Sequence, residues 1–143
     1  MKLTSSEFLD NQQIPKKFTC QGEDVSPELK IAEVPDGVKS LALIMDDPDA
    51  PGGTFVHWVV YNIALTERIG EGAIPGTQGM NDFGKQGYGG PCPPSGTHRY
   101  VFKLYALNEN LDLPEGLSKE DLEKAMADHV LAQTELIGLY AKT

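Results

Sequence analysis

The chain has 143 residues, of which 40% are hydrophobic and 23% are charged, a composition typical of a soluble globular protein with one compact domain over residues 1–143. Twelve Lys and Arg residues stand against 21 Asp and Glu residues, so the formal net charge is −9. Nucleic acids and anionic membranes are bound by basic surfaces, and this charge balance argues against both as partners.

The N-terminal segment, MKLTSSEFLD, has no hydrophobic stretch of the signal-peptide type. No apolar run approaches the roughly 20 residues that a membrane-spanning helix needs. We therefore predict a cytoplasmic protein without a transmembrane segment. The two cysteines, Cys20 and Cys92, match no zinc motif, and in a reducing compartment we expect both to be free thiols.

Three segments have the period-two pattern of β-strands. Residues 40–47 (SLALIMDD) alternate apolar side chains between two faces. Residues 54–63 (TFVHWVVYNI) and 98–107 (HRYVFKLYAL) are apolar on both faces. This pattern is typical of central strands that are covered on both sides.

Strict alternation in residues 54–63 predicts which side chains share a face. One face would carry Phe55, His57, Val59 and Tyr61. The opposite face would carry Val56, Trp58 and Val60.

A long loop is expected between the second and third strands. Residues 77–97 hold six glycines and three prolines, and a loop of this length in a compact domain is usually functional or disordered. We interpret it as ordered and functional. Five X–Pro bonds lie in the loops 46–53 and 87–96, and we expect the Ala50–Pro51 bond to be cis.

The one clear helical pattern is LSKEDLEKAMADH, residues 117–129. Ser118 is a suitable N-cap, with Asp121 three residues later in a variant capping box. Residues 130–141 return to a strand pattern. Many strands and one late helix predict a mainly β fold, a β-sandwich with a small helical appendage.

Four side chains could meet at one rim of the predicted sheet. Asp47 ends the first strand, His57 lies early in the second, and His98 and Tyr100 open the third. If these strands are neighbours, the loops 46–53 and 87–96 flank the same point. Two imidazoles, a phenol and loop N–H groups can bind a phosphate-like anion, and a carboxylate beside an imidazole favours its charged form.

Simpler interpretations exist for each of these residues. A single histidine in an apolar strand, such as His57, is more often a hydrogen-bonded core residue, and His129 fits the inner side of the helix. Asp46 and Asp49 are consistent with turn residues of a Pro-rich bend. The sequence has no HExxH, GxSxG, P-loop or GxGxxG motif, so we expect no metal and no cofactor.

Two sequence blocks resemble the signatures of a known family. DDPDAPGGTFVHW (residues 46–58) and GYGGPCPPSGTHRYVFKLYAL (residues 87–107) are similar to the paired blocks of the phosphatidylethanolamine-binding proteins (PEBPs). FTCQGEDVSPEL (residues 18–29) and GMNDFGKQGY (residues 79–88) extend the likeness to the shorter bacterial and archaeal branch, the Raf kinase inhibitor-like proteins.

This resemblance implies an antiparallel β-sandwich with a large central sheet packed on a smaller one and a few short helices. It also implies a small anion pocket at one end of the large sheet, which takes phosphate, phosphoethanolamine head groups, acetate and similar anions. The residues that match the family's pocket are Asp47, His57, His98 and Tyr100, with Asp49 close by and Gly90 and Pro91 in the wall.

Three functional hypotheses follow. The first is a non-catalytic binding or regulatory protein for a small phosphorylated or carboxylated ligand. The alternative is a protein-binding inhibitor module for a kinase or a protease, and the second alternative is a hydrolase that uses His57 or His98 as a general base, for which no activated nucleophile is visible. The resemblance also weakly indicates a homodimer. Eukaryotic members carry a further C-terminal segment at the pocket mouth, so lipid head-group specificity and Raf inhibition are not carried over.

Overall fold

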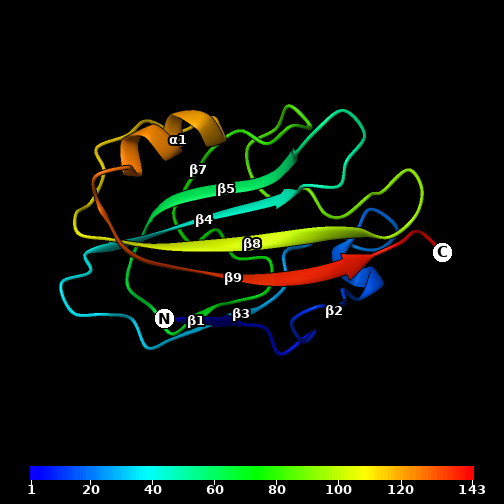
Figure 1. Cartoon of the computed structure of the whole chain (residues 1–143), viewed down its shortest axis with the longest axis horizontal. Helices are drawn as coiled ribbons and strands as arrows, with labels where there is room; N and C mark the ends of the chain where they lie inside the picture. The colour runs from blue at the N-terminus through cyan, green and yellow to red at the C-terminus, as the bar shows by residue number, and fades with distance from the viewer.

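Two β-sheets packed face to face make up most of the structure, a computed structural model that describes all 143 residues (Figure 1). The larger sheet has six strands in the spatial order β2-β9-β8-β4-β5-β7. Their bounds are Gln12–Gln13 (β2), Ser40–Asp47 (β4), Phe55–Ile63 (β5), Thr77–Gln78 (β7), His98–Leu107 (β8) and Val130–Tyr140 (β9). The smaller sheet has the order β1-β3-β6. Its strands are Lys2–Thr4 (β1), Leu29–Ala32 (β3) and Arg68–Ile69 (β6).

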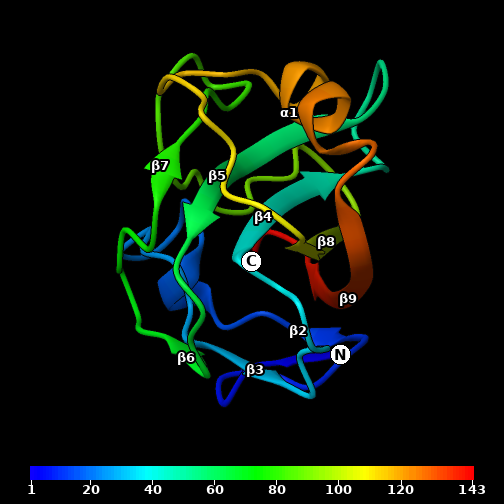
Figure 2. The same ribbon diagram turned by 90° about the vertical axis from the view of Figure 1, so that its left-hand side faces the viewer.

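The expected β-sandwich is confirmed. All strand pairs are antiparallel except β2 with β9, and Figure 2 shows the smaller sheet under one face of the larger sheet. Strands β4 and β8 have the bounds expected from the sequence, and β5 begins one residue later than expected. The short strands β1, β2, β3, β6 and β7 were not expected, because two to four residues carry too little periodicity to be recognised.

The larger sheet separates two apolar clusters. The inner cluster lies between the sheets and includes alternate side chains of β4 and β8 together with side chains of the smaller sheet: Leu41, Leu43, Met45, Tyr100, Phe102, Leu104, Leu3, Leu29, Ile31 and Ile69. The outer cluster includes the intervening side chains and those of the helix: Ala42, Ile44, Val59, Tyr61, Leu122 and Met126. Because both faces of β4, β5 and β8 are buried, these strands tolerate continuous apolar sequence.

A β-bulge in β5 overturns the alternation predicted for that strand. Met45 pairs with Trp58 but the next residue, Asp46, pairs with Val56, so His57 is an extra residue without a partner in β4. The bulge places Val56 in the outer cluster and leaves Trp58 in the inner one. An extra residue re-aims the side chains around it, which period-two reasoning cannot anticipate.

The helix α1, Lys119–Met126, covers the outer face of the larger sheet, opposite the smaller sheet (Figure 2). Ser118 is its N-cap, as expected, and the Ser118 hydroxyl accepts a hydrogen bond from the Asp121 N–H at 3.1 Å. A single 3-10 turn, η1, spans Lys16–Phe18. Neither α1 nor η1 has the length and apolar character of a membrane-spanning helix.

The two cysteines do not remain free thiols, contrary to expectation. Cys20 and Cys92 form a disulfide that joins positions 72 residues apart. The segment after η1 lies against the loop 87–96, where the Cys20 N–H donates to the Pro91 carbonyl at 3.1 Å. Sequence spacing does not show this contact, because it depends on how two distant loops meet at one end of the sandwich.

The expectation of a cis Ala50–Pro51 bond is also wrong. All peptide bonds are trans, including those before the prolines of both loops. The chain reverses direction after β4 through Gly52 and Gly53 instead, whose φ angles are +85° and +122°. Glycine adopts these positive φ values without steric cost.

Candidate functional site

Four polar side chains meet at one end of the inner face of the larger sheet. Asp47 is the last residue of β4, while His98 and Tyr100 lie at the start of β8, which runs antiparallel beside β4. His57 reaches the same place from β5, and its ring centroid is 5.2 Å from that of Tyr100. The structure thus brings together the four residues singled out in the sequence.

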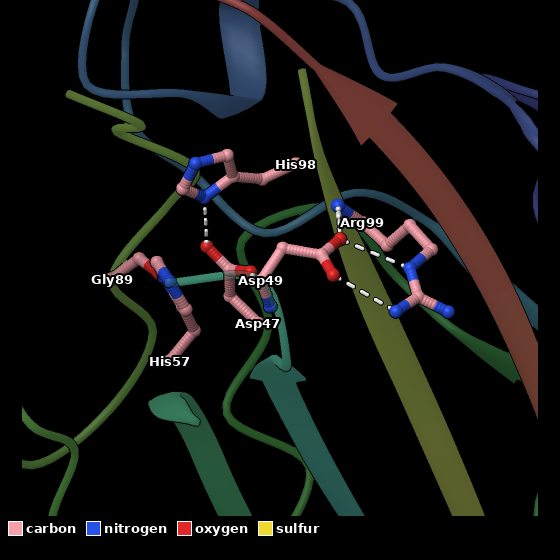
Figure 3. Close-up of polar contacts among 6 residues, drawn as sticks. All are labelled: Asp47, Asp49, His57, Gly89, His98 and Arg99. Atoms are coloured by element: carbon pink, nitrogen blue, oxygen red, sulfur yellow. Dashed lines mark hydrogen bonds and ion pairs between the residues drawn. The ribbon is translucent and has the colours of Figure 1, made fainter. Parts of the chain in front are cut away.

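A chain of hydrogen bonds fixes Asp47 and His98 (Figure 3). One Asp47 oxygen accepts a hydrogen bond from His98 Nδ1 at 2.6 Å, and the other accepts from the Asp49 backbone N–H at 2.8 Å. Asp47 is 3% exposed and His98 is 7% exposed. Because the carboxylate is an acceptor only, Nδ1 carries the proton, and Nε2 of His98 is left for another partner.

Asp49 holds this arrangement from the surface (Figure 3). Its carboxylate accepts hydrogen bonds from the backbone N–H, Nε and Nη2 of Arg99 at 2.8–2.9 Å. The guanidinium and the backbone N–H of Arg99 lower the pKa of Asp49 to about 2. Asp49 thus stays charged and bound to Arg99, and its backbone N–H stays directed at Asp47.

His57 is oriented by the loop between β7 and β8. Its Nδ1 lies 2.7 Å from the Gly89 carbonyl oxygen, so Nδ1 donates and the proton of a neutral ring sits there. The rings of Phe55, Phe83 and Tyr100 surround the imidazole, with centroids 5.1–5.3 Å away. Burial lowers the pKa of His57, and the Gly89 carbonyl and Asp47 only partly oppose this effect.

Tyr100 supplies a hydroxyl group with no partner. The residue is 0% exposed, and its hydroxyl is the one buried side-chain polar atom in the structure that makes no hydrogen bond. Burial, with the Asp47 carboxylate nearby, raises the pKa of Tyr100 well above its ordinary value, so the phenol remains protonated. Buried hydroxyls without a partner are rare in folded proteins and call for an explanation.

These four side chains line a cavity of about 220 Å³. Its remaining lining is mainly apolar. It comes from the two flanking loops, from the first residue of β5 and from the segment before the second loop: Ala50, Pro51, Cys92, Pro93, Pro94, Phe55 and Phe83. The volume is below the roughly 300–1,000 Å³ of typical ligand pockets and suits a small ligand or one head group. A hollow of about 440 Å³ between β2 and the end of β9 is larger, but no His, Asp or Glu side chain lines it.

Gly90 and Pro91, expected in the wall, are not among the lining residues. The Gly90 N–H donates to Asp24 Oδ1 at 2.8 Å, and the Pro91 carbonyl accepts from Cys20. These bonds turn the Gly90–Pro91 step toward the segment after η1. The next residues, from Cys92 to Pro94, form the wall instead.

The other candidates from the sequence lie elsewhere. Asp46 is on the outer face of the larger sheet, where it is 1% exposed and pairs with Lys103 at 3.0 Å and Lys119 at 2.8 Å. It is therefore not a turn residue, contrary to the simpler interpretation of the sequence. His129 lies after α1 with Nδ1 3.0 Å from Asn108 Oδ1. No group of His, Cys, Asp or Glu side chains is arranged to hold a metal ion.

Sequence reasoning missed several residues that shape the cavity. Phe55 and Phe83 close its apolar side, Gly89 orients His57, and Arg99 anchors Asp49. Phe83 lies in the long Gly- and Pro-rich loop, whose composition signalled order but not contact with His57. No pattern in the sequence pairs Arg99 with Asp49, because the contact depends on the register of β8 against β4.

Comparisons with known proteins agree with this fold. A family model described as phosphatidylethanolamine-binding protein matches residues 4–141. Among relatives, a UPF0098 protein of Methanothermobacter thermautotrophicus is 51% identical over 99% of both chains. A UPF0098 protein of Aquifex aeolicus is 50% identical over 99% of this chain and 89% of its own.

Two solved structures are also similar. CT736 of Chlamydia trachomatis, described as a PEBP homolog, has a TM-score of 0.96 and 45% identity, covering 99% of this chain and 97% of its own. Escherichia coli YbcL, described as a new member of the mammalian PEBP family, has a TM-score of 0.91 and 32% identity, covering 99% of this chain and 98% of its own. The chain belongs to the phosphatidylethanolamine-binding protein family.

Proposed function

We propose that this protein is a non-catalytic binding protein whose cavity takes a small anion through a phosphate or carboxylate group. The observation that carries the proposal is the Tyr100 hydroxyl, which is buried and makes no hydrogen bond within the chain. It lies in a residue that lines the cavity together with two imidazoles. An anion oxygen at that point would accept the missing hydrogen bond.

The proposed binding mode assigns roles to Tyr100, His98 and Asp47, and to the pair of Asp49 and Arg99 behind them. Tyr100 donates its hydroxyl proton, and His98 donates from Nε2 when its ring carries a second proton. Asp47 accepts a hydrogen bond from His98 Nδ1 at 2.6 Å, so the negative charge of the carboxylate compensates the positive charge of the imidazolium. Asp49 and Arg99 do not touch the ligand but keep Asp47 in place. Hydrogen bonds with one charged partner contribute roughly 1.5–3 kcal/mol each.

The contacts of the two histidines support a binding role over a catalytic one. His57 is bonded to a backbone carbonyl and His98 to a carboxylate, so neither activates a serine, threonine or cysteine. The one cysteine that lines the cavity, Cys92, is bonded to Cys20. A nucleophile with a base beside it, which the hydrolase alternative requires, is missing from the cavity.

Isothermal titration calorimetry with inorganic phosphate and with phosphoethanolamine tests the proposal. We expect both to bind the unmodified protein, and we expect His98→Ala to weaken binding at least tenfold. His129→Ala is the matched control, since it removes the histidine that lies outside the cavity. Equal affinities in the unmodified protein and His98→Ala would contradict the proposal, as would heat signals no larger than dilution.

A further inference from the structure

The Cys20–Cys92 disulfide can be approached from outside the protein. Cys20 is an exposed residue and Cys92 is half-buried. Both cysteines line a second hollow of about 150 Å³, together with Gly89 and Gly90, which have no side chains to cover the sulfurs. This hollow gives a small thiol a path to the disulfide in the folded protein. Exposed disulfides are the ones that proteins use as labile or regulatory bonds.

The chain is held firmly before Cys92 and weakly after it. Before it, the Gly90 N–H donates to Asp24 Oδ1 at 2.8 Å, and the Pro91 carbonyl accepts from the Cys20 N–H at 3.1 Å. After it, no backbone–backbone hydrogen bond forms in residues 92–97, up to the start of β8. The disulfide is thus the link that fixes the beginning of this stretch.

The same stretch forms one wall of the anion cavity. Cys92, Pro93 and Pro94 line that cavity. Cys92 and Phe83 line both the cavity and the second hollow. The disulfide therefore lies between the hollow where a thiol can approach and the cavity that is proposed to bind an anion.

We propose that Cys20–Cys92 is a redox-active disulfide, which a dithiol reductant opens through the second hollow, and that its state controls the wall of the anion cavity. The effect on the cavity rests on the proposed function. The exchange reaction itself does not, because it needs only the two sulfurs and a path to them.

The reaction is a thiol–disulfide exchange in two steps. A thiolate of the reductant attacks Sγ of Cys20, the more exposed residue; a bond forms between these two sulfurs, the Cys20–Cys92 bond breaks, and Cys92 leaves as a thiolate that takes up a proton. The second thiolate of the reductant then displaces Cys20, which also takes up a proton. The reductant has given two electrons and ends as a disulfide, and the protein ends with two thiols.

Contacts other than the disulfide keep the two segments together after the bond opens. The Tyr88 hydroxyl donates to the Phe18 carbonyl at 2.7 Å. A Cβ on Gly90 would lie 2.4 Å from the same carbonyl oxygen, so the segment after η1 packs directly on the loop 87–96. Reduction therefore releases residues 92–97 and leaves the rest of the loop in place. A ligand must then order the wall as it binds, and this ordering costs affinity.

Calorimetry with inorganic phosphate, on the protein before and after reduction by excess dithiothreitol, tests the proposal. Without denaturant, we expect a thiol reagent to detect no free thiol before treatment and both cysteines after it. Circular dichroism should show that the β-fold is retained. The affinity for phosphate should fall by about tenfold on reduction and return after reoxidation.

The cysteine variants are the matched controls. Cys20→Ser/Cys92→Ser lacks the bond, so it should bind phosphate as weakly as the reduced protein and should not respond to dithiothreitol. The single variants test the site of attack. The Cys20 thiol of Cys92→Ser should react with glutathione disulfide about tenfold faster than the Cys92 thiol of Cys20→Ser, because reactivity follows exposure. Equal rates would contradict the assigned site of attack.

The outcomes are distinguishable. If dithiothreitol releases thiols only after denaturation, the disulfide is not redox-active in the folded protein and the inference is wrong. If reduction is complete but the affinity for phosphate is unchanged, control of the cavity wall is overturned while the anion pocket stands. If the oxidised protein binds no phosphate, the proposed function fails, and the release of thiols alone then decides whether the disulfide is redox-active.

Discussion

Replacing Tyr100 with Phe should strengthen the fold while weakening ligand binding. The hydroxyl is buried without a partner, and a buried polar group in that condition costs about 1–3 kcal/mol relative to hydration in water. Phe keeps the ring contacts and removes the unpaired group. We therefore expect the free energy of unfolding to rise by about 1 kcal/mol, which corresponds to a melting temperature higher by roughly 3 °C.

The same substitution should lower the affinity for phosphate. A hydrogen bond from Tyr100 to an anion contributes roughly 1.5–3 kcal/mol, so its loss should weaken binding by about 10- to 100-fold. Urea unfolding without ligand measures the first effect, and calorimetry with inorganic phosphate measures the second. A variant that is both less stable and equally competent in binding would refute the reasoning, because the hydroxyl would then serve the fold and not the ligand.

Tyr88→Phe is the matched control for the stability effect. The Tyr88 hydroxyl donates to the Phe18 carbonyl at 2.7 Å, so its removal leaves that carbonyl without this partner. We expect Tyr88→Phe to lower the free energy of unfolding by about 1 kcal/mol. If the free energy of unfolding rises in Tyr100→Phe and falls in Tyr88→Phe, the unpaired hydroxyl of Tyr100 is the cause of the stabilisation.

Three further predictions concern stability. The double variant Cys20→Ser/Cys92→Ser should lower the free energy of unfolding by about 4 kcal/mol in urea titrations, since the disulfide closes a 72-residue separation; an unchanged midpoint would show that the bond does not form. The pKa of His57 is lowered in the fold, so the unfolded ring binds a proton first, and stability should fall as the pH drops below about 6.5. His57→Gln should remove this part of the pH dependence of stability. Identical pH profiles for the variant and the unmodified protein would contradict this role of His57. The pKa of Asp49 falls from 3.8 to about 2 in the fold, so its contribution to stability should be present above pH 4 and lost as the pH falls toward 2. Asp49→Asn should flatten that part of an acid-unfolding curve. An unaltered curve would contradict the bond to Arg99.

The central strands could be predicted from the sequence because burial on both faces leaves a clear signal. β4 and β8 have the expected bounds, and α1 has the expected cap at Ser118. The smaller sheet left no such signal. Its strands have two to four residues, and they become strands because backbone groups of distant segments pair with one another.

The loops around the cavity were harder to predict for a different reason. Glycine and proline content indicated ordered turns, yet neither the Cys20–Cys92 bond nor the turn of Gly90 away from the cavity follows from composition. Both depend on the segment after η1, which lies against the loop 87–96. Contacts between two irregular segments have no period in sequence, so only the coordinates reveal them.

His57 shows how a local irregularity creates the site. Asp47, His98 and Tyr100 lie on the inner face through ordinary alternation, in phase with Met45 and Phe102.

A regular β5 would not place His57 on this inner face. Trp58 and Val60 belong to the inner cluster, so strict alternation would turn His57 to the outer face beneath α1, away from the cavity. The bulge opposite Met45 and Asp46 adds one residue, and Val56 takes the outer position instead. His57 is then free to point toward Tyr100 and to donate to Gly89. Bulges occur often beside binding sites, and here the extra residue is the one whose ring lines the cavity.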